Sequence, residues 1–162
     1  MWRRLDRSLI GAFMYPVILG LHNLNRWVVV IVGVWAVLRF WRGWMRRGVW
    51  AAADAQAMRF FVIALDVQML LGFLLYAVFS PLTRQAFGDM GAAMRDPAVR
   101  YFVADHMVIM VLAIAVAHVA SVRVRKAASD SARFQTAAIW FGIVLAAILG
   151  FIPWMRPLVP SF

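Results

Sequence analysis

Residues 101–126, YFVADHMVIMVLAIAVAHVASVRVRK, form the stretch that decides the fold. No charged residue occurs between Val108 and Ala117, and the residues on either side are mostly apolar. Because an apolar helix of about 20 residues crosses about 30 Å of hydrocarbon, this stretch is predicted to span a membrane. It ends in a basic cluster and carries two of the three histidines, His106 and His118.

The composition of the whole chain agrees with a membrane protein. Of its 162 residues 65% are hydrophobic and 15% are charged, whereas soluble domains are about half apolar and about a quarter charged. The net charge of +10 comes from arginines that cluster between apolar runs, which is typical of membrane orientation and not of nucleic-acid binding. The absence of cysteine excludes disulfides, iron–sulfur clusters and covalently attached haem.

Three further stretches are predicted to span the membrane. They run from about His22 to Trp44, from about Met58 to Ser80 and from about Phe134 to Ile152. The second ends where Pro81 follows, and the fourth ends at Pro153, because proline cannot continue a helix. Residues 81–100 are predicted to form a loop. The sequence therefore predicts an all-α protein, an integral membrane four-helix bundle.

Residues 1–21 are predicted to form a separate N-terminal segment before a four-span domain over residues 22–162. The segment begins with the basic stretch MWRRLDR and continues with 14 mostly apolar residues that include Pro16. This pattern resembles a signal peptide, but no small-x-small cleavage site follows. We expect an interfacial or re-entrant helix. A fifth, short span over residues 8–24 is the alternative, because it would bring the N-terminal arginines to the cytoplasmic side.

The distribution of basic residues predicts the orientation of the spans. The segments proposed to face the cytoplasm carry nine (Arg39, Arg42, Arg46, Arg47, Arg59, Arg123, Arg125, Lys126 and Arg133), and the opposite loop carries three (Arg84, Arg95 and Arg100). Basic loops are retained in the cytoplasm. The loop over residues 81–100 is therefore expected on the outer side of the membrane, in a multi-pass protein surrounded by the lipid bilayer.

Two histidines are predicted to lie at the same depth on different helices. His22 opens the first span at its outer end, and His106 lies a turn and a half into the third span, also from its outer end. Two imidazoles from separate helices are what bis-histidine ligation of a b-type haem (heme b) requires. Arg26, one turn from His22 on the same helix face, is placed to pair with a haem propionate, and Trp27 to contact the ring edge.

Two other interpretations of these residues stay open. Met107 and Met110 flank His106, so a copper site of histidine and methionine side chains is conceivable. In the other interpretation no cofactor binds. His22 then caps its helix together with two nearby asparagines, and His106 pairs with Asp105.

A second polar group is predicted closer to the cytoplasmic side. His118 lies 12 residues beyond His106, about 18 Å along a helix axis, so the two cannot ligate one metal ion. Asp66 in the second span lies at a comparable depth, and a carboxylate in lipid needs a partner or a proton. His118 is the expected partner. With Gln68 nearby, this group is either a proton or quinone site, or an interhelical hydrogen bond that holds the bundle together.

Four motifs resemble those of a group of small bacterial four-span membrane proteins. They are H-x3-R-W in the first span (His22, Arg26, Trp27), D-x-Q-x2-L-G-x3-Y in the second (Asp66, Gln68, Leu71, Gly72, Tyr76), acidic-His-x3-Met in the third (Asp105, His106, Met110) and I-P-W after the fourth (Ile152, Pro153, Trp154). The likeness covers about residues 20–155, and the group is similar to the four-helix membrane cytochromes b. Di-haem cytochromes use four axial histidines, so the three present here allow at most one bis-histidine haem.

The sequence thus predicts a membrane haem protein that transfers electrons near the outer leaflet. Its expected partners are quinone or a larger respiratory or photosynthetic complex, and not nucleic acid. The chain has no glycine-rich phosphate loop and no nucleophile–base pair, so an electron carrier is favoured over a stand-alone enzyme. The alternative is a cofactor-free accessory or assembly subunit of a larger membrane complex.

Overall fold

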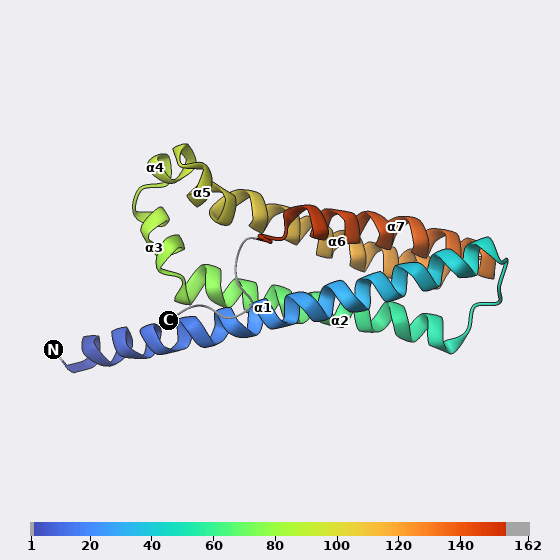
Figure 1. Ribbon diagram of the computed structural model, residues 1–162, viewed down its shortest axis with the longest axis horizontal. Coiled ribbons are helices and arrows are strands. Elements are labelled where there is room, and N and C mark those ends of the chain that lie inside the picture. Colours follow the sequence, from blue (N-terminus) through green and yellow to red (C-terminus); the bar gives the residue numbers. More distant parts are fainter. Residues whose placement is uncertain (1, 155–162) are drawn as a thin grey trace.

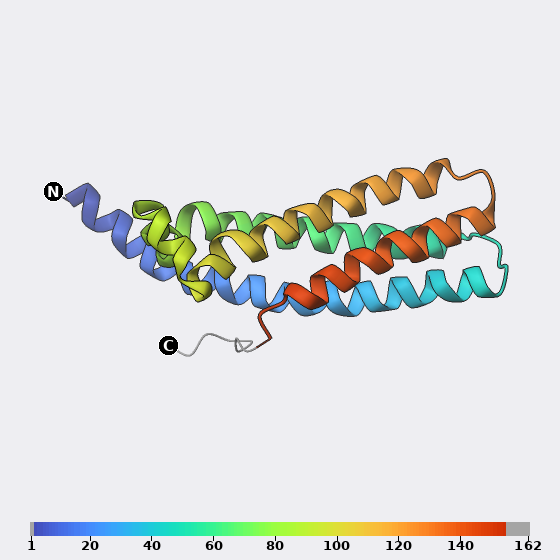
Figure 2. The same cartoon turned by 90° about the horizontal axis from the view of Figure 1, so that it is seen from above.

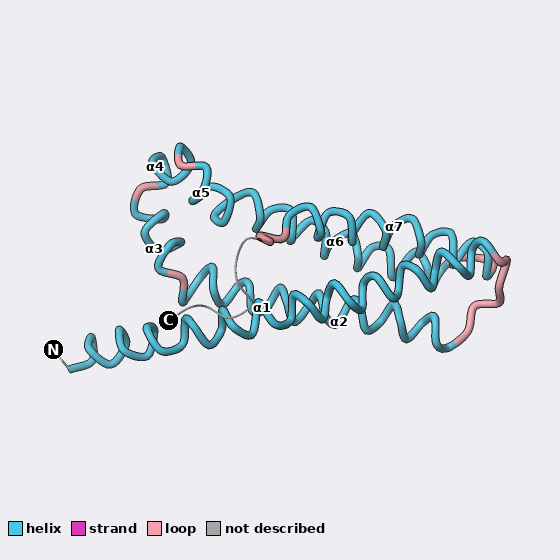
Figure 3. The backbone as a smooth tube through the Cα atoms, viewed as in Figure 1, coloured by secondary structure: helices cyan, strands magenta, loops and turns pink. Residues whose placement is uncertain are grey.

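The computed structural model describes residues 2–154, and about 90% of the protein is helical (Figure 1). Loops are short, and no strand occurs among the described residues (Figure 3). The elements in chain order are α1 (Trp2–Met45), α2 (Ala52–Leu74), the π-helix η1 (Leu75–Phe79), α3 (Pro81–Gly88), α4 (Met90–Arg95), α5 (Pro97–Arg100), the π-helix η2 (Tyr101–Asp105), α6 (His106–Lys126) and α7 (Asp130–Phe151).

The predicted fold class is confirmed. Four helical stretches are long and apolar enough to cross a membrane, and they form an antiparallel bundle of the multi-pass membrane type. Each corresponds to one predicted span: Phe13–Met45, Ala52–Phe79, Pro97–Lys126 and Asp130–Phe151. The observed second and fourth helices begin earlier than predicted, because the polar residues ahead of each apolar run are helical as well.

The two ends of the bundle differ in construction (Figures 1 and 2). At one end, short loops join α1 to α2 and α6 to α7, and the clustered arginines lie there; we call this the basic end. At the other end, η1 leads into α3, α4 and α5, which return through η2 into α6. We call this the cap end. The C-terminal end of α7 also lies at the cap end.

The first helix corrects one prediction. α1 continues as one unbroken helix through residue 21, so residues 8–24 form neither a re-entrant segment nor a separate fifth span. Pro16 lies inside the helix, where it removes one backbone hydrogen bond without ending the helix. The polar residues near position 22 do not end it either. One of them, Asn25, bonds across to α2 through its side chain, donating to the backbone oxygen of Ala64 at 3.0 Å. An interfacial position for residues 1–21 stays a prediction.

The predicted loop between the second and third spans is a cap of three short helices. Each begins at a side chain that accepts hydrogen bonds from backbone N–H groups two or three residues later, and these side chains belong to Ser80, Asp89 and Asp96. The hydroxyl of Tyr76 in η1 donates to the backbone oxygen of Val103 in η2 at 3.0 Å. This bond joins the two chain segments that lead into and out of the cap.

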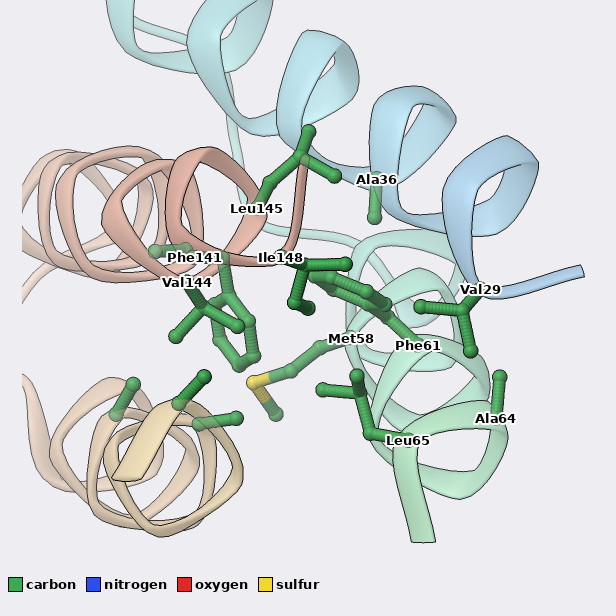
Figure 4. Packing of buried hydrophobic residues seen from close by; sticks show 14 of the residues in the cluster. Val29, Ala36, Met58, Phe61, Ala64, Leu65, Phe141, Val144, Leu145 and Ile148 are labelled. Carbon is green, nitrogen blue, oxygen red and sulfur yellow. The ribbon is translucent and has the colours of Figure 1, made fainter. Parts of the chain in front are cut away.

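Aromatic side chains fill the core of the basic half. Phe40 of α1, Phe61 of α2 and Phe141 of α7 are completely buried, and the ring of Phe141 lies 5.8 Å from that of Phe40 and 5.9 Å from that of Phe61, measured between centroids. Figure 4 shows Phe61 and Phe141 pointing into the space between the helices. A Cβ atom at Gly33 would lie 2.8 Å from the ring of Phe61, so this glycine lets α1 approach α2 closely.

Candidate functional site

A cavity of about 510 Å³ lies between the four long helices in the cap half. His22 and His106, predicted at one depth on different helices, both line it, as do Arg26 and Gln68. Side chains of α3 form part of its boundary toward the cap. Its walls are mainly apolar, and no acidic side chain occurs among the described residues that line it.

The His22 side chain is held by a polar cluster between α1 and α2. The Gln68 amide nitrogen lies 3.1 Å from Nε2 of His22 and donates to the His22 backbone oxygen, also at 3.1 Å. The Gln68 amide oxygen accepts from Asn25 at 2.8 Å. Because the amide nitrogen must donate, Nε2 of His22 is the acceptor and its proton resides on Nδ1. Nδ1 is buried and has no hydrogen-bond partner among the described residues.

The His106 side chain is oriented by the end of α7. Its Nδ1 lies 2.8 Å from the backbone oxygen of Phe151, to which the Tyr101 hydroxyl also donates at 2.7 Å. Phe151 is the last residue of α7, so its carbonyl lacks a partner within the helix and can accept both bonds. The alternative pairing of His106 with Asp105 is not observed. The Asp105 carboxylate instead lies 3.4 Å from Nε of Arg100.

Arg26 is a buried cation that has no anionic partner among the described residues. The residue is only 6% exposed, and its Nε and one terminal nitrogen have no hydrogen-bond partner in the described chain. Its guanidinium carbon lies 5.7 Å from the ring centroid of Trp27. Burying a charge is costly unless it is paired, so the Arg26 donors suit a group that carries acceptors or negative charge.

Trp27 is not one of the described residues that line this cavity. Its ring packs edge-on against Trp154, with centroids 6.0 Å apart. Trp27 follows Arg26 by one residue and is therefore turned about 100° away around the helix. Its contact with a haem edge stays a prediction. Met107 and Met110 do line the cavity beside His106. Within residues 2–154, no cluster of three or more His, Cys, Asp or Glu side chains could hold a metal ion.

The predicted contact between Asp66 and His118 is present, but Gln68 takes no part in it. Nε2 of His118 lies 2.8 Å from Oδ1 of Asp66, across the seam between α6 and α2, and the side chains are 53% and 49% exposed on the outside of the bundle. Gln68 belongs to the cavity and not to this pair. It follows Asp66 by two residues, which turns its side chain about 200° around the helix.

Sequence reasoning missed two groups that position the histidines. Asn25 holds the Gln68 amide, and Tyr101 shares the Phe151 carbonyl with His106. A polar residue inside an apolar span is a signal that could have indicated Asn25. The Phe151 carbonyl has a weaker signal in the sequence. Pro153 marks where the helix ends, but it does not indicate which backbone carbonyl accepts the hydrogen bonds.

Comparisons with known proteins do not place the chain in a family. No family model matches it, and neither does any curated protein or solved structure. The resemblance to small four-span membrane proteins stays a prediction. Function is therefore inferred from the cavity and its side chains.

Proposed function

We propose that the protein binds a b-type haem in the cap-half cavity and transfers electrons at the outer side of a bacterial inner membrane. The observation that carries this proposal is the buried guanidinium of Arg26, which shares an apolar cavity with two histidines and with no acidic side chain among the described residues. Haem is a flat apolar group with two carboxylates, so it would supply both the missing anions and the apolar bulk. When bound, it would supply one-electron redox chemistry.

The donor set fits such a group. His106 would ligate through Nε2, because its Nδ1 donates to the Phe151 carbonyl, and such a bond fixes the orientation of a metal-binding imidazole and raises its basicity. His22 would ligate through Nδ1 if its proton moves to Nε2 and the Gln68 amide presents its oxygen there, or through Nε2 if the Gln68 amide turns away. Arg26 would pair with a propionate.

The cap offers a surface for a protein partner. Phe87, Met90 and Met94 are exposed on α3 and α4, outside all four candidate spans, where hydrocarbon does not account for apolar side chains. Such exposed apolar residues mark contact surfaces. This supports electron exchange with a larger respiratory or photosynthetic complex, although quinone is a further possible partner. It equally supports the second candidate function, a cofactor-free accessory or assembly subunit that docks through the cap.

An optical spectrum of the detergent-purified protein, oxidised and then dithionite-reduced, tests the haem proposal. We expect the sharp reduced bands of a low-spin b-type haem. A featureless visible spectrum of protein made in its own host contradicts haem binding. In that case, co-purification with a partner complex that is lost in a Phe87→Ser/Met90→Ser variant would support the accessory subunit.

The three histidines allow a matched test of the ligands. His22→Ala and His106→Ala should each abolish the Soret band of a bis-histidine haem while the protein stays in the membrane. His118→Ala is the control, because this histidine lies outside the cavity, and its spectrum should match that of the wild type. Retention of the band in both cavity variants would show that the ligand assignment is wrong.

A further inference from the structure

A second cavity, of about 340 Å³, lies near the basic end between α2 and α6. Three arginines line it, Arg59, Arg125 and Arg133, together with Trp50, His118 and Ser121. No acidic side chain occurs among the described residues that line it, and it shares no lining residue with the cap-half cavity. Any function of this cavity is therefore independent of the haem proposal.

Two of the three arginines carry charge that the described chain does not neutralise. Arg133 forms an ion pair with Asp130, with 3.2 Å between its terminal nitrogen and the carboxylate oxygen. Arg59 on α2 and Arg125 on α6 are exposed, and neither forms an ion pair with a described residue. The cavity thus has an unpaired guanidinium on each of the two helices that form its walls.

Apart from the arginines, His118 and Ser121, the lining of the cavity is apolar. Met58, Val62 and Ile63 of α2 and Val124 of α6 line it beside the arginines. Among the neighbouring pairs of long helices, α2 and α6 are the least closely packed. Ile63 beside the cavity is 50% exposed, so apolar surface continues from the cavity onto the outside of the bundle. A ligand that fits this surface has an anionic head and an apolar tail.

We propose that the basic-end cavity binds one anionic phospholipid, with its phosphate between Arg59 and Arg125 and an acyl chain along the α2–α6 seam. Arginine binds phosphate through paired N–H donors, and basic pockets between membrane helices at the cytoplasmic surface bind acidic head groups. Trp50 at the cavity margin suits the head-group layer, where tryptophan is enriched. A soluble anion would satisfy the arginines but leave the apolar seam uncovered.

The test measures lipid binding to the full-length protein in a neutral detergent by native mass spectrometry. Phosphatidylglycerol is added at increasing concentration, and phosphatidylcholine in parallel. The double variant Arg59→Gln/Arg125→Gln should bind phosphatidylglycerol about thirtyfold more weakly, and each single variant about fivefold, because each arginine near the surface contributes a similar factor. The matched control, Arg46→Gln/Arg47→Gln, removes the same charge from the same end outside the cavity, and it should bind like the wild type.

Three results would overturn the proposal. One is equal weakening in the control variant, which would indicate bulk charge and not a site. Another is phosphatidylcholine binding as tight as that of phosphatidylglycerol. The third is displacement of the lipid by millimolar inorganic phosphate, which would show a site for the free anion. Unfolding curves of all variants in the same detergent ensure that weaker binding does not reflect a misfolded bundle, and both substituted arginines are exposed.

Discussion

The two halves of the bundle use the same four helices for different purposes. In the basic half, Phe40, Phe61 and Phe141 are completely buried in the core between the helices, and small residues let the helices approach. In the cap half, the helices enclose a cavity of about 510 Å³ lined by buried donors that have no partner among the described residues. Close packing stabilises a fold, whereas voids and unpaired polar groups weaken it. The difference indicates that the basic half holds the bundle together and that the cap half is shaped for a ligand.

The helical geometry follows the same division. Both π-helical segments, η1 and η2, occur at the cap end, beside the cavity, and the described chain of the basic half has none. Insertions of a π turn are found mostly at functional sites, because they shift the side chains that follow around the helix axis. Here η2 directly precedes His106, so it sets the face on which this histidine lies.

The largest effect on stability should come from creating a void in the core of the basic half. Phe61→Ala removes a completely buried ring and should lower the free energy of unfolding by about 3 kcal/mol, measured by denaturation in mixed micelles. Phe60→Ala is the matched control, because its side chain is 53% exposed on the same helix, and it should cost less than about 1 kcal/mol. Equal losses in the two variants would show that the basic half is not the stabilising core.

Replacing either of two arginines of α1 should change the free energy of unfolding, but in opposite directions. Arg39 pairs with the buried carboxylate of Asp54, so Arg39→Met should cost about 2 kcal/mol by leaving that charge unpaired, a figure reduced because Arg39 is partly exposed. Arg26 has no anionic partner among the described residues, so Arg26→Met leaves no such charge unpaired and should stabilise the cofactor-free protein by about 1 kcal/mol. The measurement is the same denaturation on both. A destabilised Arg26→Met protein would contradict the view that the cavity is incomplete without a ligand.

The smallest effect concerns the pair between the halves. Asp66→Leu removes its bond to His118 and should cost about 1 kcal/mol, the size of other hydrogen bonds between membrane helices. Asp66→Asn keeps an acceptor oxygen and should lose less in the same assay. Unchanged stability of Asp66→Leu, together with an altered pH dependence of electron transfer, would instead favour a proton relay.

The sequence predicts features that depend on position along a helix better than those that depend on angle around it. The length of each apolar run indicates four spans, and counting from their ends puts His22 level with His106 and Asp66 level with His118. The prediction that groups Gln68 with Asp66 and His118 is wrong, because nearness along the chain does not determine the helix face on which a side chain lies.

Other features depend on tertiary partners that have no local signal. Asn25 in the middle of α1 bonds across to Ala64 and Gln68 of α2. The orientation of His106 comes from a backbone carbonyl 45 residues away in the chain. Side-chain patterns predict neither bond, since any residue at position 151 could supply the carbonyl.

The length of one helix has a consequence for access to the cavity. α7 has 22 residues and is about 33 Å long, close to the thickness of the hydrocarbon layer, about 30 Å. The stretches Ala52–Phe79 and Pro97–Lys126 also have one end at the basic end of the bundle. They contain 28 and 30 residues and therefore reach about 10 Å further toward the cap end. His106 contacts the last residue of α7 and is therefore expected near the hydrocarbon boundary, whereas Ile114 and Ile148 extend the cavity deeper into the bundle. A reactant that enters beside His106 would then reach the outer part of the cavity without crossing the lipid interior.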